Sequence, residues 1–213
     1  STNGVNPLVG SGARQVGRRC RSEAGSEPIR GQQSCSAYPT VGVICVNFVL
    51  KGFARMSHIR KKAVGGLEAG ETFSVSRTFS ELDVIQFADI SRDYNPVHFD
   101  ERFSKVKNFD NRICHGLLVA SLLTEIGGQI GWLASGMSFE FRKPVYFGDT
   151  IRCDLTITEM DVKGRAKAEV VFTNENDIIV LEAVLTGIVP GVREKKVLKD
   201  MLAEGDPTNK ISL

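Results

Sequence analysis

The 213-residue chain lacks the patterns on which several common chemistries depend. It has no glycine-rich phosphate loop, no G-x-S-x-G sequence around a nucleophilic serine, and no group of closely spaced metal-ligating residues. Its five cysteines show neither C-x-x-C nor C-x-x-H spacing, which argues against a zinc site and against a disulfide framework. We therefore expect a protein that needs no metal ion and no other cofactor.

Strong net charge and long apolar runs are missing as well. The formal net charge of +2 is too small to suggest binding to nucleic acid. The apolar patch at residues 41–50 is too short to cross a bilayer. We expect neither a nucleic-acid partner nor a membrane span.

Residues 1–55 differ in composition from the rest. Gly, Ser, Arg and Pro are mixed there without periodicity, and seven basic residues face two acidic ones, so the remainder has a net charge near −3. Three interpretations stay open: a translated region upstream of a natural start at Met56, an organelle-targeting peptide, or an extension that covers the site or binds a partner. We expect disorder in this segment. The expected location is cytoplasmic, or mitochondrial if the segment is a transit peptide.

Periodicity predicts an α+β domain over residues 56–190. Ser80 and Asp83 resemble a capping box at the start of a helix. A nearly continuous apolar run at 117–132 predicts one long, buried central helix. Residues 191–213 read as a charged tail with at most a short surface helix. The remaining expected elements are a strand at 72–79, helices at 80–91 and 100–107, a strand around 137–141 with one face packed, and strands at 150–160, 165–173 and 178–189.

The first chemical motif is D-Y-N-P-V-H, from Asp93 to His98. Pro96 excludes a helix interior, and Asn-Pro commonly starts a turn, which would fold His98 back alongside Asp93. A carboxylate and an imidazole a few ångströms apart can bind and polarise one water molecule. The alternative is that Asp93 caps a turn while His98 bonds a nearby carbonyl.

The second motif is His115-Gly116 at the start of the apolar run. The first N–H groups of a helix have no partner within the helix. Glycine at this position lets a ligand carbonyl approach the backbone closely. This arrangement is typical of an oxyanion hole, although Gly116 could also be only a close packing site.

Three blocks of sequence resemble the MaoC-like family of (R)-specific enoyl-CoA hydratases and 3-hydroxyacyl-thioester dehydratases. They lie in the family's order and at similar spacing, and the resemblance covers about residues 65–190. One position departs from the family pattern, which usually has Gly before the catalytic Asp, where this chain has Arg92. The blocks are I-S-R-D-Y-N-P-V-H-F-D-E-R-F at 90–103, I-C-H-G-L-L-V-A-S at 113–121 and F-R-K-P-V-Y-F-G-D-T at 141–150.

The resemblance implies a hot-dog fold, in which an antiparallel sheet wraps around a central helix. It also implies a homodimeric lyase that reversibly hydrates trans-2-enoyl thioesters of CoA or acyl carrier protein to (3R)-hydroxyacyl thioesters. Asp93 and His98 would be the catalytic pair, and the Gly116 N–H would bind the thioester oxygen. Beside the substrate we expect Asn95, Cys114 and His115.

Other interpretations of single features remain open. His115 could instead be a third catalytic group or bond only to the backbone, and Cys114 is more simply a structural residue than a nucleophile. A hot-dog thioesterase would need a carboxylate near the central helix, where Glu125 is the candidate, and a non-catalytic acyl-binding module would need no acid–base pair. A set of basic residues is expected either to meet an acidic carrier or the phosphates of CoA, or to be solvated: Arg60, Lys61, Lys62, Lys105, Lys107 and Arg112.

Overall fold

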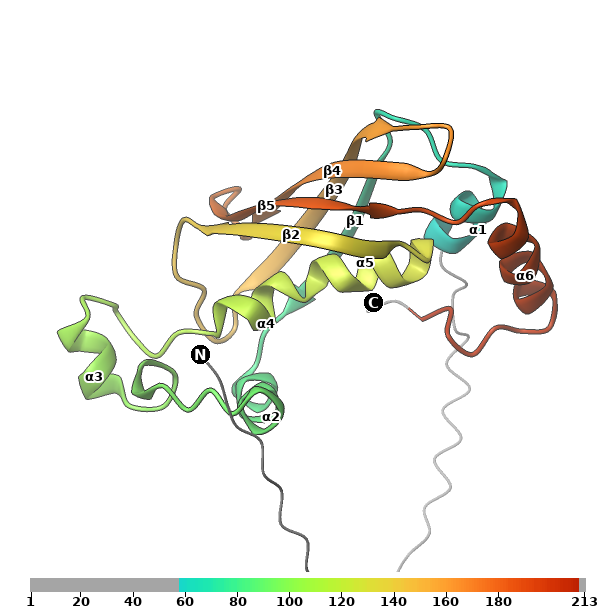
Figure 1. The fold of residues 1–213 in the computed structure, drawn as a ribbon. Helices are drawn as coiled ribbons and strands as arrows, with labels where there is room; N and C mark the ends of the chain where they lie inside the picture. The colour runs from blue at the N-terminus through green and yellow to red at the C-terminus, as the bar shows by residue number, and fades with distance from the viewer. Residues whose placement is uncertain (1–57, 211–213) are drawn as a thin grey trace, which may run out of the picture. The chain divides into compact units, whose positions relative to one another are not determined.

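The computed structural model describes residues 58–210. Residues 1–57 and 211–213 lie outside the described residues, and so do the interpretations of the amino-terminal segment and of Met56. The described chain forms one sheet of antiparallel strands in the order β1-β3-β4-β5-β2 (Figure 1). The strands are β1 Thr72–Thr78, β2 Leu133–Phe141, β3 Thr150–Met160, β4 Arg165–Thr173 and β5 Ile179–Ile188.

Helices occupy the segments before, between and after the strands. In the described part of the chain, none of them is long and apolar enough to cross a membrane. The predicted elements are present within one or two residues of their expected bounds, apart from the central helix and β2, which begins four residues before the expected strand around 137–141. The helices are α1 His58–Gly65, α2 Glu81–Ser91, the 3₁₀ helix η1 Pro96–His98, α3 Glu101–Val106, α4 Gly116–Ala120, α5 Leu122–Ile130 and α6 Val192–Ala203.

The core lies between α5 and one face of the sheet (Figure 1). Side chains of β3 and β4 alternate between buried and less buried, as expected for strands with one packed face. Leu155 on β3 is registered with Val170 on β4, which is registered with Ala183 on β5. These side chains and Ile126 of α5 are nearly inaccessible to solvent. The expected α+β layout, with a sheet packed on central helical structure, is confirmed.

The central helix is not the single long helix that the apolar run predicts. It is divided at Ser121 into α4 and α5. The Ser121 hydroxyl donates to the Leu118 carbonyl at 2.6 Å, and the Thr124 hydroxyl donates to the Ser121 carbonyl at 2.6 Å. Such bonds to nearby carbonyls compete with the regular helical ladder, so two polar side chains interrupt an otherwise apolar helix. Gly131, in the left-handed region at φ 80°, ends α5.

Strand β2 is more exposed than its alternating pattern predicts. Met137 is 42% exposed and Phe141 56%, so of the three residues on the expected face only Phe139 packs against the core within the single chain. β2 is an edge strand that pairs only with β5, which leaves its second edge without a neighbour in the described chain. The sequence pattern predicts the alternation, but it does not show that this strand lies at the edge of the sheet.

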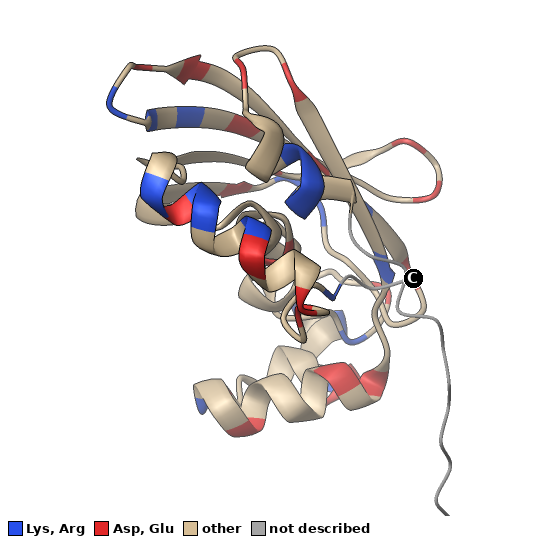
Figure 2. Cartoon of the chain, turned by 90° about the vertical axis from the view of Figure 1, so that its right-hand side faces the viewer, with Lys and Arg blue, Asp and Glu red and all other residues tan. Residues whose placement is uncertain are grey.

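The carboxy-terminal segment is more firmly attached than a charged tail. Arg60 of α1 is 4% exposed, pairs with Asp206 at 2.6 Å, and donates to the carbonyls of Gly128 and Gln129 at the end of α5. We call Arg60 and Asp206, with the two α5 carbonyls, the carboxy-terminal clasp. Figure 2 faces the side on which α1 and α6 lie.

The clasp excludes Arg60 from the expected carrier-binding cluster, because a buried arginine cannot meet a phosphate in solution. Some other members of that cluster also form local ion pairs. Lys62 pairs with Glu71, and Arg112 with Glu81.

Candidate active site

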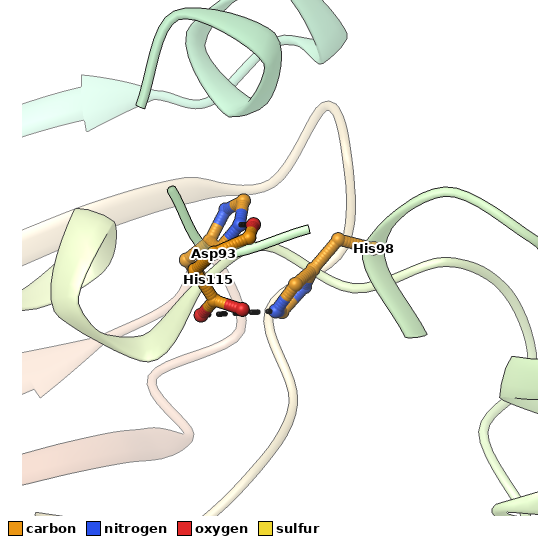
Figure 3. Close-up of side chains that lie close together, drawn as sticks. All are labelled: Asp93, His98 and His115. Atoms are coloured by element: carbon orange, nitrogen blue, oxygen red, sulfur yellow. Dashed lines mark hydrogen bonds and ion pairs between the residues drawn. The ribbon is translucent and has the colours of Figure 1, made fainter. Parts of the chain in front are cut away.

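The loop between α2 and α3 brings Asp93 and His98 together. A capping box starts α2: the Asp83 N–H donates to the Ser80 hydroxyl, and the Asp83 carboxylate accepts from the Ser80 N–H. Arg92 ends the helix in the left-handed region at φ 62°, which turns the chain out immediately before Asp93. Asp93 Oδ2 then lies 3.9 Å from His98 Nε2 (Figure 3).

This separation is too long for a direct hydrogen bond and suits a water molecule that bonds both atoms. Nδ1 of His98 donates to the Ile113 carbonyl at 2.8 Å. Because a carbonyl only accepts, Nδ1 carries the proton and Nε2 presents its lone pair toward Asp93. Asp93 also accepts from the Asn95 N–H at 3.2 Å. The side chains lie close together, as the first interpretation predicts, and the turn and carbonyl bonds of the simpler alternative are present as well, since His98 has two nitrogens and Asp93 two oxygens.

Burial sets the charge of His98. Its side chain is 8% exposed, whereas that of Asp93 is 51% exposed. Burial lowers the pKa of His98 below its ordinary value of 6.5; the bond to Ile113 and the Asp93 carboxylate act in the opposite direction. His98 is therefore neutral near pH 7 and able to accept a proton.

His115 lies behind this pair and is 1% exposed. Its Nε2–H donates to the backbone carbonyl of Asp93 at 2.9 Å. Its ring stacks on that of His98, with centroids 3.7 Å apart and planes inclined by 30°. His115 thus bonds to the backbone, as one of its interpretations from sequence predicted.

Gly116 is the first residue of α4, directly after His115. Its α-carbon faces the ring of Phe141 at the end of β2: a Cβ at position 116 would lie 2.5 Å from Phe141 Cε1. A side chain at position 116 would therefore require the Phe141 ring, which is 56% exposed, to move aside. The two interpretations of Gly116, packing site and ligand approach, do not exclude each other.

A cavity of about 430 Å³ joins these groups, which is within the usual range for small-molecule sites. Cys114, 4% exposed, forms part of its wall. Burial raises the pKa of this thiol to about 12, so it stays protonated and is a poor nucleophile. Other lining residues are Asp93, His98, Phe109, Ile113, His115, Gly116, Leu117, Val119, Phe141, Arg142, Lys143, Pro144, Val145, Val180 and Leu181.

Comparison with known proteins assigns this chain to a family. The family model for the MaoC like domain matches residues 66–178, more than half of the chain. The chain belongs to the MaoC-like family.

Two relatives in this comparison are named as enzymes that hydrate or dehydrate acyl thioesters. One is the mitochondrial 3-hydroxyacyl-[acyl-carrier-protein] dehydratase of Arabidopsis thaliana, 33% identical over 135 residues, which are 59% of this chain and 80% of that protein. Another is the (R)-specific enoyl-CoA hydratase of Aeromonas caviae, 35% identical over 98 residues, which are 44% of this chain and 73% of that protein.

A solved structure supports the fold. The (R)-hydratase from A. caviae involved in PHA biosynthesis superposes with a TM-score of 0.56 at 28% identity, covering 59% of this chain and 98% of that one. The described chain has the hot-dog fold of this family, as the three sequence blocks predict.

The three side chains of Figure 3 form a cluster that linear spacing did not reveal. One ligand atom each from Asp93, His98 and His115 can be chosen so that all lie within 4.8 Å of one another. Nitrogen lone pairs lie in the ring planes, and stacked rings direct them side by side rather than at one point. One nitrogen of each ring is also bonded to a carbonyl. The cluster fits proton transfer better than coordination of an ion.

The structure separates the expected substrate-binding residues. Cys114 and His115 line the cavity, whereas Asn95 does not. The side chain of Asn95 instead accepts from the Val97 N–H and caps η1. Sequence reasoning missed Phe141 as a cavity residue, because its strand pattern contains no sign of the distant Gly116.

Proposed function

We propose that this protein reversibly adds water to trans-2-enoyl thioesters and forms (3R)-3-hydroxyacyl thioesters. The observation that carries the proposal is the pairing of Asp93 Oδ2 with the unprotonated Nε2 of His98 across 3.9 Å at the wall of a cavity. The names of the Arabidopsis and Aeromonas relatives support the reaction and its stereochemistry.

The pair suits the binding of a water molecule by its two hydrogens. The Asp93 carboxylate and His98 Nε2 are both acceptors, so one water can donate to each and direct its oxygen lone pair away from them. That lone pair would face the β-carbon of a substrate in the cavity. Neither group needs to change protonation before the reaction starts.

Hydration then proceeds with the chain's own acid–base groups. As the water oxygen bonds to the β-carbon, one O–H bond breaks and its proton passes to the pair. The electron pair of the carbon–carbon double bond moves toward the thioester oxygen, giving an enolate-like species. A proton from the pair then reaches the α-carbon, which completes the addition of one water. Dehydration is the reverse.

The Gly116 N–H is proposed as the donor to the thioester oxygen. It is the first N–H of α4, and no backbone acceptor for it is found within the described chain. Because α4 has only five residues, the proposal relies on this hydrogen bond and not on a long helix dipole. Cys114 and His115, which precede Gly116, would form the apolar wall beside the acyl group.

We further propose a homodimer, in which β2 or the exposed side chains around it are covered by a second copy. β2 has an unpaired edge in the described chain and exposes Met137 and Phe141. Phe141 also lines the cavity, so a second copy would shape the acyl site. Light scattering on the purified chain tests this, and a monomer at micromolar concentration would contradict it.

The thioesterase alternative receives less support. Glu125 lies on α5 and does not line the cavity, so the carboxylate that such an enzyme would use is not beside the proposed thioester position. A non-catalytic acyl-binding module would not need the carboxylate–imidazole pair. The pair therefore favours the hydratase.

One assay tests all three functions. The full chain is incubated with crotonyl-CoA while enoyl absorbance and free thiol are followed together. Loss of enoyl absorbance without thiol release supports the hydratase, and chiral analysis of the product tests the (3R) configuration. Thiol release would support the thioesterase, and no reaction with saturable binding would support the acyl-binding module.

The compartment is a separate proposal, which concerns residues outside the described part. The Arg- and Ser-rich composition of residues 1–55 and the mitochondrial relative support a mitochondrial address as the alternative to a cytoplasmic one. A fluorescent protein fused behind residues 1–55 in eukaryotic cells distinguishes the two by its location.

A further inference from the structure

His115 is the most deeply buried ionisable side chain of the site, yet the proposed reaction gives it no proton to carry. Counted over the whole residue, His115 is 1% exposed and His98 6%. Burying an imidazole costs free energy unless its nitrogen atoms form hydrogen bonds. Its Nδ1 has no hydrogen-bond partner among the described residues, so only Nε2 is satisfied. The contacts of this ring therefore indicate what its burial achieves.

Those contacts reach both members of the proposed catalytic pair. On one side, Nε2–H donates to the Asp93 carbonyl at 2.9 Å. On a face of the ring lies His98, with centroids 3.7 Å apart. The ring centroids of Phe87, on α2, and Phe99 lie 5.1 Å and 6.2 Å from that of His115. These two rings hold the His115 ring in place.

We propose that His115 is a positioning residue, whose Nε2–H holds the Asp93 backbone and whose ring supports the His98 imidazole, so that the carboxylate and Nε2 stay at water-binding distance. This inference rests on the proposed hydration. It assigns His115 to the geometry of the pair and not to contact with the reacting atoms.

Asp93 needs such support because its other hydrogen bonds are to residues close to it in sequence. Its side chain is 51% exposed, its carboxylate accepts from the Asn95 N–H, and its own N–H donates to the Ser91 hydroxyl. The preceding residue, Arg92, has a left-handed conformation that a non-glycine residue adopts at a cost. A misplacement of about 1 Å can reduce turnover by about a hundredfold. A bond from a buried ring to the Asp93 carbonyl is a direct means of preventing it.

The ring has a second, separable effect on His98. The titratable groups that face His98 in the described chain are Asp93, from the loop after α2, and His115, at the start of α4. Burial is the main cause that lowers the pKa of His98, and His115 lowers it further. Removing the ring would admit water and raise the pKa of His98 toward 6.5. Removing only the N–H would leave the ring's shielding in place.

Two substitutions in the full chain separate these effects. His115→Phe keeps a ring and loses the donor, whereas His115→Gln keeps an amide donor and loses the ring. We expect His115→Phe to lower kcat on crotonyl-CoA by about ten- to a hundredfold with little change in KM. It should raise the pKa of His98 less than His115→Gln does, because it removes the electrostatic effect of His115 but keeps a ring in place. We expect His115→Gln to retain more turnover and to raise the pKa of His98.

The pKa of His98 is measured by NMR titration of the imidazole resonances, which are few because the chain has three histidines. His58→Gln, at an exposed position on α1, is the matched control and should change neither quantity. Parental kcat in His115→Phe would overturn the anchoring of Asp93, and an unchanged His98 pKa in folded His115→Gln would overturn the support of the ring. The titration needs no turnover, so it tests the ring contact even if the chain hydrates no thioester. If His115→Phe fails to fold, His115→Met replaces it: methionine is similar in size to glutamine and lacks the donor, so equal kcat in His115→Met and His115→Gln would overturn the anchoring of Asp93.

Discussion

The ring of Phe141 occupies the space that a side chain at position 116 would need, since a Cβ there would lie 2.5 Å from Phe141 Cε1. The first helical residue of α4 and the last residue of β2 are thereby in contact across the cavity wall. A substitution at Gly116 therefore has two consequences: it alters the proposed donor and it displaces an aromatic ring. Experiments on the donor must separate the two.

The donor is best tested in a Phe141→Ala background, where the ring is absent. In that background, Gly116→Ala keeps the N–H, whereas Gly116→Pro removes it. Proline is tolerated in the first turn, and His115 at φ −62° and ψ 133° has the conformation that a residue before proline prefers. We expect Gly116→Pro to hydrate crotonyl-CoA about a hundred- to a thousandfold more slowly than Gly116→Ala, as for loss of one oxyanion donor. Equal rates in the two folded double variants would assign the thioester oxygen to another donor.

The acid–base pair gives the largest expected loss. Asp93→Asn or His98→Gln should each reduce kcat by about two to four orders of magnitude, the range typical of acid–base groups. Asp93→Asn should leave the melting temperature nearly unchanged, because its side chain is half exposed. Asp200→Asn, at an exposed position of α6 away from the cavity, is the matched control. Turnover near that of the parent in either pair variant would exclude the proposed mechanism.

The acid limb of the pH profile should report His98. The reaction needs its neutral form, and burial lowers its pKa below 6.5. Activity should therefore persist as the pH falls through 6.5 and decline only at lower pH, where His98 becomes protonated. The measurement is kcat/KM on crotonyl-CoA between pH 4.5 and about 8, the range that contains the ordinary histidine pKa. A limb at or above 6.5 would show that burial does not control this group.

Local chemistry made much of this structure predictable from sequence. The Ser80 capping box and the alternating strands depend on neighbouring residues, and they formed where expected. The motif around Pro96 likewise predicted a turn that brings Asp93 and His98 together, and these atoms do lie 3.9 Å apart.

Features that depend on distant contacts were not predictable in this way. The stacking of His115 on His98 and the contact of Phe141 with Gly116 join segments that the sequence keeps apart. Arg60 appeared as one of three consecutive basic residues, and only the folded chain shows that it alone is buried against Asp206. The Ser121 hydroxyl was a local indication that the central helix could break there. The apolar pattern around it nevertheless led to the prediction of one long helix.

The backbone conformation at position 92 accounts for the glycine that the family pattern usually has where this chain has Arg92. At φ 62° and ψ 20° it has the left-handed conformation that glycine adopts freely. Arg92→Gly should raise the free energy of unfolding by about 0.5–1 kcal/mol, since relief of the left-handed cost of about 1–2 kcal/mol exceeds the added chain entropy of glycine. Gln86→Gly, at an exposed helical position of α2, should instead destabilise by about 0.5–1 kcal/mol. Denaturant unfolding of both variants checks this, and destabilisation by Arg92→Gly would mean that the arginine side chain has a stabilising contact.

The carboxy-terminal clasp should contribute strongly to stability. Arg60→Met keeps an apolar chain of similar length but leaves the Asp206 carboxylate, with a side chain 1% exposed, without its cation. It also removes the donors to the Gly128 and Gln129 carbonyls at the end of α5. We expect a melting temperature several degrees below that of the parent at pH 7. Lys61→Met, at the exposed neighbouring position, should change it little.

The pH dependence provides an independent check of the clasp. Hydrogen bonding from Thr208, together with Arg60, lowers the pKa of Asp206 below 3.8. A carboxyl group whose pKa is lowered by folding stabilises the protein above its unfolded pKa and loses that contribution as the pH falls through the folded value. The difference in melting temperature between the parent and Asp206→Asn should thus be constant from pH 7 to about 5 and shrink below 3.8. A difference that stays constant into this acidic range would show that the Asp206 charge does not stabilise the clasp.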